Sequence, residues 1–242
     1  MKVLDLFAGI GGFSLGLERA GMTTVAFCEI EPYCQAVLKK HWPGVPIFND
    51  ITHLKYRQNV DLVTAGFPCQ DISLAGEGAG ITGERSGLFW YVIRTLCMVG
   101  RPQALLENVA ALLNRGMGIV LGALASFGYD TEWHCIPASY VGARQLRDRV
   151  WIVASPQLDA VQRRQTITAA WYVKSRKEQL AGLVQPCAWP EVSSARNSGT
   201  GHGIPNGIHR NKALGNAVVP AIPEILGKAI MAFEREREDE NA

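Results

Sequence analysis

The feature that most constrains the fold is a short apolar run that ends in glycine and leads to a cysteine. Residues 60–65 form a largely apolar run of the kind found in buried parallel strands, and Gly66 ends it. Pro68 then fixes the backbone angle immediately before Cys69. A cysteine there lies at the carboxyl end of a strand, where open α/β sheets hold their ligands. The pattern predicts an α/β fold in which Cys69 is either a nucleophile or a small apolar side chain packed under a loop.

The same alternation of short apolar runs and helix-like stretches continues along the chain. At 242 residues it suits one large domain, or one domain with a small appendage. We expect strands at residues 2–7, 23–28, 46–48, 60–65, 103–106, 131–136 and 150–154, and helices at 13–20, from about 31, 88–99 and 118–127. A helix-like stretch at 213–233 and a frayed, charged tail at 234–241 would complete the chain.

The first expected strands end in residues typical of a nucleotide-type cofactor site. Gly9 and Gly11 lie in a turn that lets the backbone approach a ligand and opens a helix. Glu29 follows about 20 residues later, where an acid hydrogen-bonds ribose in dinucleotide folds. Asp5 within the first strand and Asp50 after the third add further carboxylates. Tight packing turns and ordinary helix starts would explain the same residues, and S-adenosylmethionine would suit the geometry equally well.

Further candidates follow the later strands. Glu107 ends the strand at 103–106, where an apolar surrounding would favour its protonated form. Arg147 and Arg149 would lie on one side of an extended segment and reach the same site, although clustered arginines are usually solvated. The glycine-rich residues 74–87 are either a lid beside Cys69 or a surface excursion.

Together these residues resemble the DNA cytosine-5 methyltransferase family. The matching motifs, in the family's order, are residues 5–12, Glu29, Asp50, Pro68-Cys69-Gln70, Glu107-Asn108-Val109, Gln145 with Arg147 and Arg149, and residues 215–218. The resemblance covers almost everything except residues 156–200. It implies an α/β, Rossmann-like S-adenosylmethionine-dependent methyltransferase fold, with a mostly parallel sheet and a small target-recognition insertion.

The resemblance also implies a role for each matching residue. Cys69 would add to carbon 6 of a cytosine flipped out of duplex DNA, and Glu107, fixed by Asn108, would meet ring nitrogen 3. Arg147 and Arg149 would hold the base's carbonyl and the negative charge near the thiolate. The residues expected to contact S-adenosylmethionine are Phe7, Gly9, Gly11, Glu29, Asp50, Ile51, Pro68, Leu88, Asn216 and Val218. No metal is implied.

The resemblance divides the chain into a catalytic and cofactor-binding core at 1–155, a recognition region at 156–210 and a segment at 211–242 that returns to the core. Basic and aromatic residues interleave in the recognition region, which suits a nucleic-acid surface, although a helical insertion with a solvated face remains an alternative. The expected guanine readers are Arg163, Arg164, Arg176 and Arg196, and the expected phosphate contacts are Lys174 and Lys177. So short a region would read only a few base pairs.

Composition sets the remaining expectations. The six cysteines form no Cys-x-x-Cys pair and have no zinc-like spacing with histidine, which indicates reduced thiols in a cytoplasm. We find no signal peptide and no apolar run of membrane-spanning length, and we expect a monomer. A net charge of +2 neither requires nor excludes DNA. A restriction endonuclease acting on the same site is a candidate partner.

Two other functions remain open at this point. A transfer-RNA cytosine methyltransferase would share the fold and the chemistry. A catalytically silent DNA-binding relative would share the fold alone, but the joint presence of Cys69, Glu107, Arg147 and Arg149 argues against it.

Overall fold

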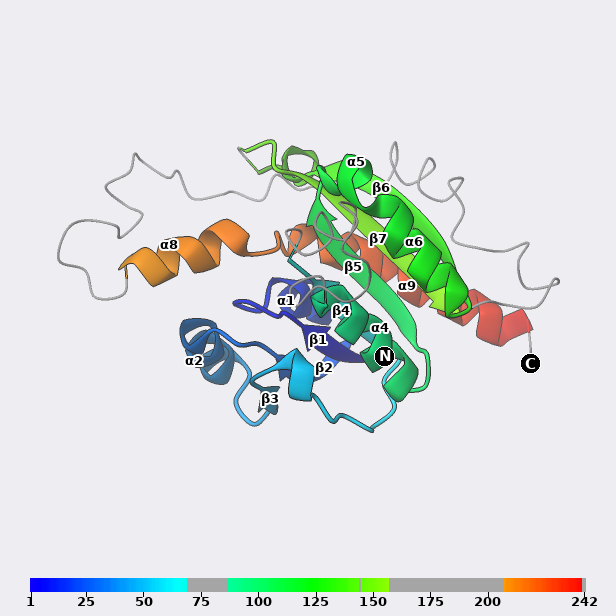
Figure 1. Cartoon of the computed structure of the whole chain (residues 1–242), viewed down its shortest axis with the longest axis horizontal. Helices are drawn as coiled ribbons and strands as arrows, with labels where there is room; N and C mark the ends of the chain where they lie inside the picture. Colours follow the sequence, from blue (N-terminus) through cyan, green and yellow to red (C-terminus); the bar gives the residue numbers. More distant parts are fainter. Residues whose placement is uncertain (69–86, 144, 157–206, 241–242) are drawn as a thin grey trace.

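A computed structural model describes residues 1–68, 87–143, 145–156 and 207–240 of the chain. Figure 1 shows a twisted sheet with helices on both of its faces. Cys69, the expected lid and the recognition residues 157–206 lie outside the described part.

The sheet is mostly parallel, as expected. In the described residues its seven strands lie in the order β3-β2-β1-β4-β5-β7-β6. Strands β1 to β5 run parallel, whereas β7 is antiparallel to both β5 and β6. The strands are β1 (Lys2–Leu6), β2 (Thr23–Cys28), β3 (Ile47–Phe48), β4 (Leu62–Gly66), β5 (Gln103–Val109), β6 (Tyr129–Pro137) and β7 (Asp148–Pro156).

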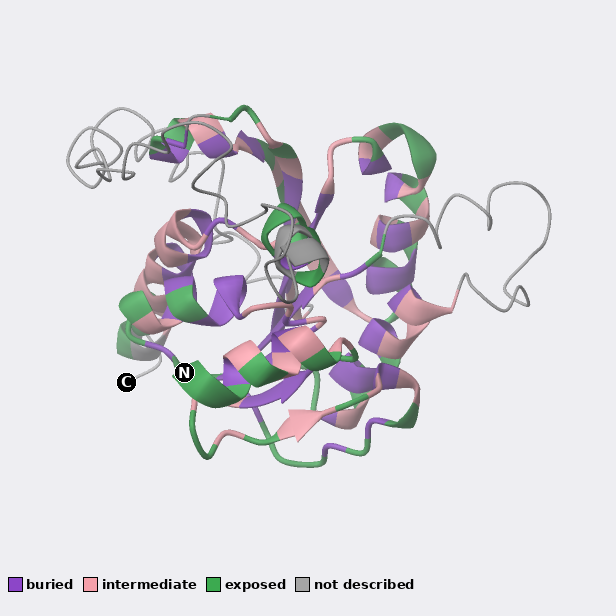
Figure 2. Ribbon diagram, turned by 90° about the vertical axis from the view of Figure 1, so that its left-hand side faces the viewer, coloured by how far each residue is buried: buried purple, intermediate pink, exposed green. Residues whose placement is uncertain are grey.

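Helices cover the two faces because side chains alternate along the buried strands. In β1, Val3 points to one apolar cluster, and Leu4 and Leu6 point to the other. The helices on the Val3 side are α1 (Gly12–Arg19) and α9 (Ala221–Glu240), and those on the Leu4 side are α4 (Leu88–Met98), α5 (Leu112–Arg115) and α6 (Met117–Ser126). The remaining elements are α2 (Pro32–His41), which contacts α8 (Gly207–Asn216), and two short 3₁₀ turns, η1 (Ile51–His53) on the Leu4 side and η4 (Ala138–Val141) on the Val3 side. Figure 2 shows the buried strands enclosed between these layers.

The C-terminal helix packs closely on the first helix because three glycines leave room for it. A Cβ atom on Gly12 would collide with the carbonyl oxygen of Val218, and one on Gly16 with the carbonyl oxygen of Pro220. A Cβ atom on Gly227 would lie 2.8 Å from a methyl carbon of Leu17. The residues that follow α8 are therefore held against the start of α1.

Two expectations for the C-terminal part are wrong. The helix-like stretch at 213–233 is interrupted at residues 217–220, where the carbonyl oxygens of Gly215 and Ala217 bond to Arg147 rather than continue a helix. The expected frayed tail is helical as far as Glu240. Glu234 accepts a hydrogen bond from Gln103 and pairs with Arg237, which ties this part of α9 to the sheet.

By length and composition alone, one segment of the described chain, Lys212–Arg237, would be long and apolar enough to cross a membrane. From the sequence we expected no such run. In the structure this segment contains the 217–220 interruption, and its residues Ile222, Ala229 and Ile230 are buried.

A fully buried carboxylate connects the sheet to the first helix. Asp5 accepts hydrogen bonds from the hydroxyls of Ser14 and Thr64, each at 2.7 Å. Asp5 therefore joins β1, α1 and β4 and has no contact with solvent. Burial raises the pKa of Asp5 to about 6, against the lowering effect of the two hydroxyls.

We predict that Asp5→Asn removes a pH-dependent loss of stability. Because the pKa is raised in the folded state, the wild type binds a proton on folding and loses stability as pH rises from about 4 to about 6. The free energy of unfolding of Asp5→Asn, relative to wild type, should rise by about 3 kcal/mol between pH 4 and pH 7. Urea unfolding at several pH values measures this difference.

The exposed residue Asp239 supplies a matched control. Asp239→Asn should leave the pH dependence unchanged. A constant difference between Asp5→Asn and wild type across this pH range would contradict the assignment of Asp5.

Candidate active site

Glu29 is fixed by backbone amides from two loops. The N–H of Gly9 donates to its Oε2 at 2.6 Å, and the N–H of Glu31 donates to its Oε1 at 2.8 Å. The amide of Gln35 donates to the backbone carbonyl of Glu29 at 2.6 Å. The side chain is buried at the end of β2. Each carboxylate oxygen keeps further acceptor capacity, so Glu29 can accept from a ligand without losing these contacts.

The turn after β1 depends on left-handed backbone conformations. Phe7, Gly9 and Gly11 have φ angles of 53°, 56° and 86°. A Cβ atom on Gly11 would lie 2.5 Å from the ring of Trp42, whose Nε1 donates to Glu18 at 2.7 Å. Both the conformation and the neighbouring ring therefore require glycine at position 11. The N-cap residue Gly11 has no side chain to bond the first amides of α1, and of these amides the one of Ser14 is bonded to the Asp5 carboxylate.

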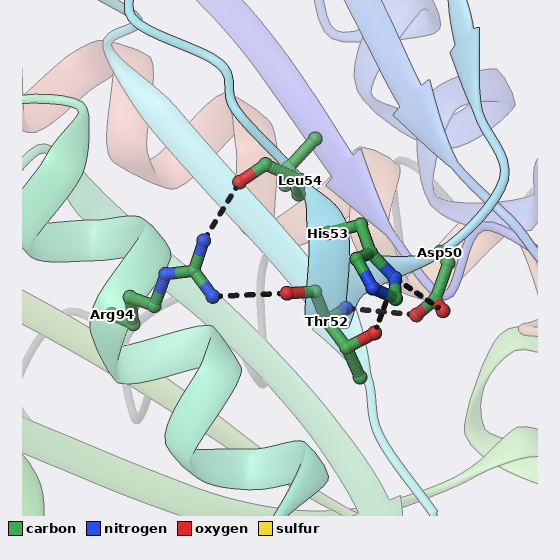
Figure 3. A network of polar contacts seen from close by, with 5 residues as sticks. All are labelled: Asp50, Thr52, His53, Leu54 and Arg94. Atoms are coloured by element: carbon green, nitrogen blue, oxygen red, sulfur yellow. Dashed lines mark hydrogen bonds and ion pairs between the residues drawn. The ribbon is translucent and has the colours of Figure 1, made fainter.

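Asp50 begins the turn after β3. Its Oδ1 accepts from the N–H of Thr52 at 2.8 Å, and its Oδ2 lies 3.0 Å from Nδ1 of His53 (Figure 3). The Thr52 amide and hydroxyl, with a smaller contribution from His53, hold the pKa of Asp50 below its ordinary value. The next residue, Ile51, is buried. Asp50 is therefore an ionised acceptor held beside an apolar side chain.

Glu107 and Arg149 form an ion pair between β5 and β7. Arg149 Nε lies 2.8 Å from Glu107 Oε1, and both side chains are largely buried. Burial raises the pKa of Glu107, whereas the guanidinium groups of Arg149 and Arg147 lower it. Gly66 pairs with Glu107 across the sheet, and a Cβ atom there would lie 3.4 Å from Glu107 Oε2. The Glu107 carboxylate thus lies over Gly66 at the end of β4, and Gly66 is three residues before Cys69.

Asn108 differs from its expected role. Its amide nitrogen donates to the carbonyl oxygen of Phe67 at 2.9 Å, and its Oδ1 accepts from the N–H of Val109 at 2.9 Å. The expectation that Asn108 fixes Glu107 is not met in these contacts, because Arg149 pairs with that carboxylate. Asn108 instead fixes the backbone immediately before Pro68 and Cys69.

Arg147 connects β7 to the residues before α9. Its two terminal nitrogens donate to the carbonyl oxygens of Gly215 and Ala217, at 2.7 and 2.8 Å. Its φ of 39° is left-handed, so the expected extended segment is interrupted at this residue. Arg147 therefore fixes the turn that carries Asn216 and Val218, and it also lies close enough to Glu107 to lower the pKa of that carboxyl.

The structure places the described candidates at the end of the sheet where the parallel strands β1 to β5 finish. Phe7, Gly9 and Gly11 follow β1, Glu29 follows β2, Asp50 and Ile51 follow β3, Pro68 follows β4, Leu88 begins α4, Glu107 lies two residues before the end of β5, and Asn216 and Val218 lie at the end of α8 and beyond it.

Sequence reasoning missed two connections at this edge. Arg94 of α4 bonds to the Asp50 turn, and Nζ of Lys212 lies 2.7 Å from the carboxylate of Glu31. The family motifs do not single out Arg94. Only the basic charge of Lys212 could have indicated an acidic partner.

The chain is similar to known cytosine methylases over most of its length. The family model described as C-5 cytosine-specific DNA methylase matches residues 1–198. The chain is 44% identical over 163 residues to the Type II methyltransferase M2.BsuMI of Bacillus subtilis (strain 168), covering 64% of this chain and 42% of that protein. It is 36% identical to the Type II methyltransferase M.CviJI of Paramecium bursaria Chlorella virus IL3A, covering 63% of this chain and 42% of the relative. The chain thus spans less than half the length of these relatives.

Solved structures show the same fold. A putative DNA modification methyltransferase encoded within a prophage (E. coli) has a TM-score of 0.54 at 25% identity, covering 64% of this chain and 47% of that one. A DNMT2 mutant from Spodoptera frugiperda has a TM-score of 0.55 at 24% identity, covering 66% of this chain and 51% of that one.

We predict that Arg149→Met makes stability depend on pH through Glu107. Without Arg149 the pKa of Glu107 should rise further, so the carboxyl holds its proton at low pH and must ionise unpaired at high pH. The variant should lose about 3 kcal/mol of unfolding free energy at pH 8, and clearly less at pH 5. Urea unfolding at both pH values measures the two losses.

The double variant Glu107→Gln/Arg149→Met separates this effect from lost packing. The unfolding free energy that the double variant loses relative to wild type should not grow between pH 5 and pH 8, as the loss in Arg149→Met does. The pair would not have the assigned role if the single and double variants showed the same pH dependence.

Proposed function

This chain belongs to the family of C-5 cytosine-specific DNA methylases, and from that premise we propose that it methylates carbon 5 of cytosine in duplex DNA. One observation carries the proposal. The Glu107–Arg149 pair lies over the end of β4, directly before the Pro68-Cys69 step. A carboxyl group whose pKa is raised by burial and a nucleophile would then reach the same small ring.

Cys69 supplies the nucleophile in this proposal. Its thiolate adds to carbon 6 of cytosine, which breaks the double bond between carbons 5 and 6 and leaves an electron-rich carbon 5. The addition also places electron density on ring nitrogen 3. Glu107, whose pKa is raised by burial, donates a proton there. Once carbon 5 carries the methyl group, loss of its remaining proton and return of the nitrogen 3 proton to Glu107 restore the double bond and expel Cys69.

Arg149 and Arg147 hold the charges in this step. Arg149 is already oriented by Glu107, so it can meet the carbonyl oxygen of the base without reorganising. Arg147 keeps the 215–217 turn in place while contributing positive charge near Glu107. Asn108 holds the Phe67 carbonyl and hence the start of the segment that carries Cys69.

The residues present fit S-adenosylmethionine, which supplies an electrophilic methyl group on its sulfonium. Glu29 is a fixed, buried acceptor suited to ribose hydroxyls. The start of α1 after Gly11, which has no capping side chain, favours the carboxylate of the methionine part. Ionised Asp50 is an acceptor suited to the amino group of adenine. The remaining proposed contacts come from Phe7, Gly9, Ile51, Pro68, Leu88, Asn216 and Val218.

The DNA side of the proposal rests on residues outside the described part. Carbons 5 and 6 are inaccessible inside a duplex, so the target cytosine must be flipped out. Residues 156–210 would read the flanking bases, and residues 74–87 would close over the site. The Type II relatives suggest a restriction endonuclease as a partner acting on the same sequence. A cytoplasmic monomer remains part of the proposal.

We predict methyl transfer to duplex DNA and not to RNA. Incubation with methyl-labelled S-adenosylmethionine should label unmethylated genomic DNA as 5-methylcytosine and leave total transfer RNA unlabelled. Cys69→Ser should abolish labelling but bind S-adenosylhomocysteine within a few fold of wild type, because Cys69 serves the base.

The possible outcomes distinguish the two nucleic acids. Labelling of transfer RNA alone would establish the RNA enzyme in place of the DNA enzyme. Undiminished labelling by Cys69→Ser would remove Cys69 from the mechanism.

We predict that Glu29→Gln weakens cofactor binding by about 1–3 kcal/mol. Both oxygens of Glu29 accept from backbone N–H groups, and a glutamine would present its own N–H₂ to one of them. Isothermal titration with S-adenosylhomocysteine measures the loss, and circular dichroism checks the fold. The exposed Glu236→Gln is the control and should bind normally. Unchanged affinity in Glu29→Gln would exclude the ribose role.

A further inference from the structure

The segment that carries Asp50 and Ile51 has little regular structure of its own. It follows β3, a two-residue strand that pairs only with β2 at the edge of the sheet. The turn η1 that it enters has three residues. Short 3₁₀ turns are weakly stable alone, so contacts from other elements must set their orientation.

Burial anchors this segment but does not orient it. Ile51 and Leu54 are 5% and 1% exposed and insert into the apolar cluster on the α4 side of the sheet. These two side chains fix how closely the turn packs against the apolar cluster. Apolar contacts are not directional, so they leave rotation of the Asp50 carboxylate about the chain axis poorly determined.

Arg94 of α4 supplies directional contacts. Its Nη1 donates to the carbonyl oxygen of Thr52, and its Nη2 donates to that of Leu54, both at 3.0 Å. Figure 3 shows the guanidinium spanning these two oxygens while Thr52 and His53 bond to Asp50 on the other side of the turn. One planar group is thus connected through the turn to the Asp50 carboxylate.

The chemistry of this contact requires arginine. The two nitrogens bond to separate carbonyl oxygens in a fixed fork, whereas the single nitrogen of lysine cannot reproduce that arrangement. The ring of Tyr91, one helical turn earlier, lies 5.5 Å from the Arg94 guanidinium carbon and limits its movement. α4 also begins at Leu88, so Arg94 connects the Asp50 turn to the helix that carries another proposed cofactor contact.

We propose that Arg94 is a positioning residue for cofactor binding, which orients η1 so that the Asp50 carboxylate meets the 6-amino group of the adenine ring. The inference rests on the proposed function, because it needs an adenine at Asp50. Arg94 itself is exposed and contributes little to global stability. Its loss should therefore affect binding of one ligand atom rather than folding.

A double comparison tests this role. The full chain and Arg94→Lys are titrated with S-adenosylhomocysteine and with an analogue in which hydrogen replaces the 6-amino group of adenine. Arg94→Lys should bind S-adenosylhomocysteine about tenfold more weakly than wild type, the effect of one well-placed hydrogen bond. For the analogue, the two proteins should agree within about twofold, because the contact that Arg94 orients is missing.

The controls separate positioning from a structural role. Arg115→Lys, the same change at an exposed arginine of α5, should bind both ligands as wild type does. Arg94→Lys should unfold thermally at the wild-type temperature. An equal loss for both ligands, or no loss for either, would overturn the inference. If the wild-type chain bound neither ligand, the proposed function itself would fall, and this inference with it.

Discussion

The structure depends on burying three carboxylates near the carboxyl ends of its strands. A buried carboxylate is costly unless its partners are fixed beforehand, and each of these has them. Asp5 is held by the hydroxyls of Ser14 and Thr64, Glu29 by two backbone amides, and Glu107 by Arg149. Asp5 has no solvent contact and joins β1, α1 and β4, so it is structural. Glu29 and Glu107 keep acceptor or proton-donor capacity, which makes them available for chemistry.

These anchors connect parts of the chain that are distant in sequence. Arg147 bonds to the carbonyls of the 215–217 turn, and Asn108 bonds to the carbonyl of Phe67. The end of β4, the start of β7 and the turn before α9 therefore lie together at the same end of the sheet. Arg94 adds the turn after β3. The cofactor and base sides of the proposed site are thus each supported by polar contacts between distant parts of the chain.

Local patterns in the sequence predicted the elements but not these contacts. Strands such as β4 could be predicted because they are short apolar runs ended by glycine, and Glu29 because acids recur at strand ends. The break at 217–220 could not, because it depends on Arg147 some 70 residues away. The roles of Asn108 and Arg94 likewise depend on partners brought near only by folding. The tail to Glu240 was predicted to be frayed because it is highly charged. Its contact between Glu234 and Gln103 joins residues distant in sequence and could not be predicted from that pattern.

The central claim is that Cys69, which follows the backbone fixed by Asn108, forms a bond to carbon 6 of cytosine. Duplex fragments made with 5-fluorocytosine test it most directly, because fluorine cannot leave carbon 5 as a cation and the adduct persists. The account predicts a denaturation-resistant protein–DNA adduct that requires S-adenosylmethionine, with the tryptic peptide containing Cys69 attached to the base. An adduct that survives in Cys69→Ser would contradict it, as would methylation of ordinary DNA with no adduct on the fluorinated fragments.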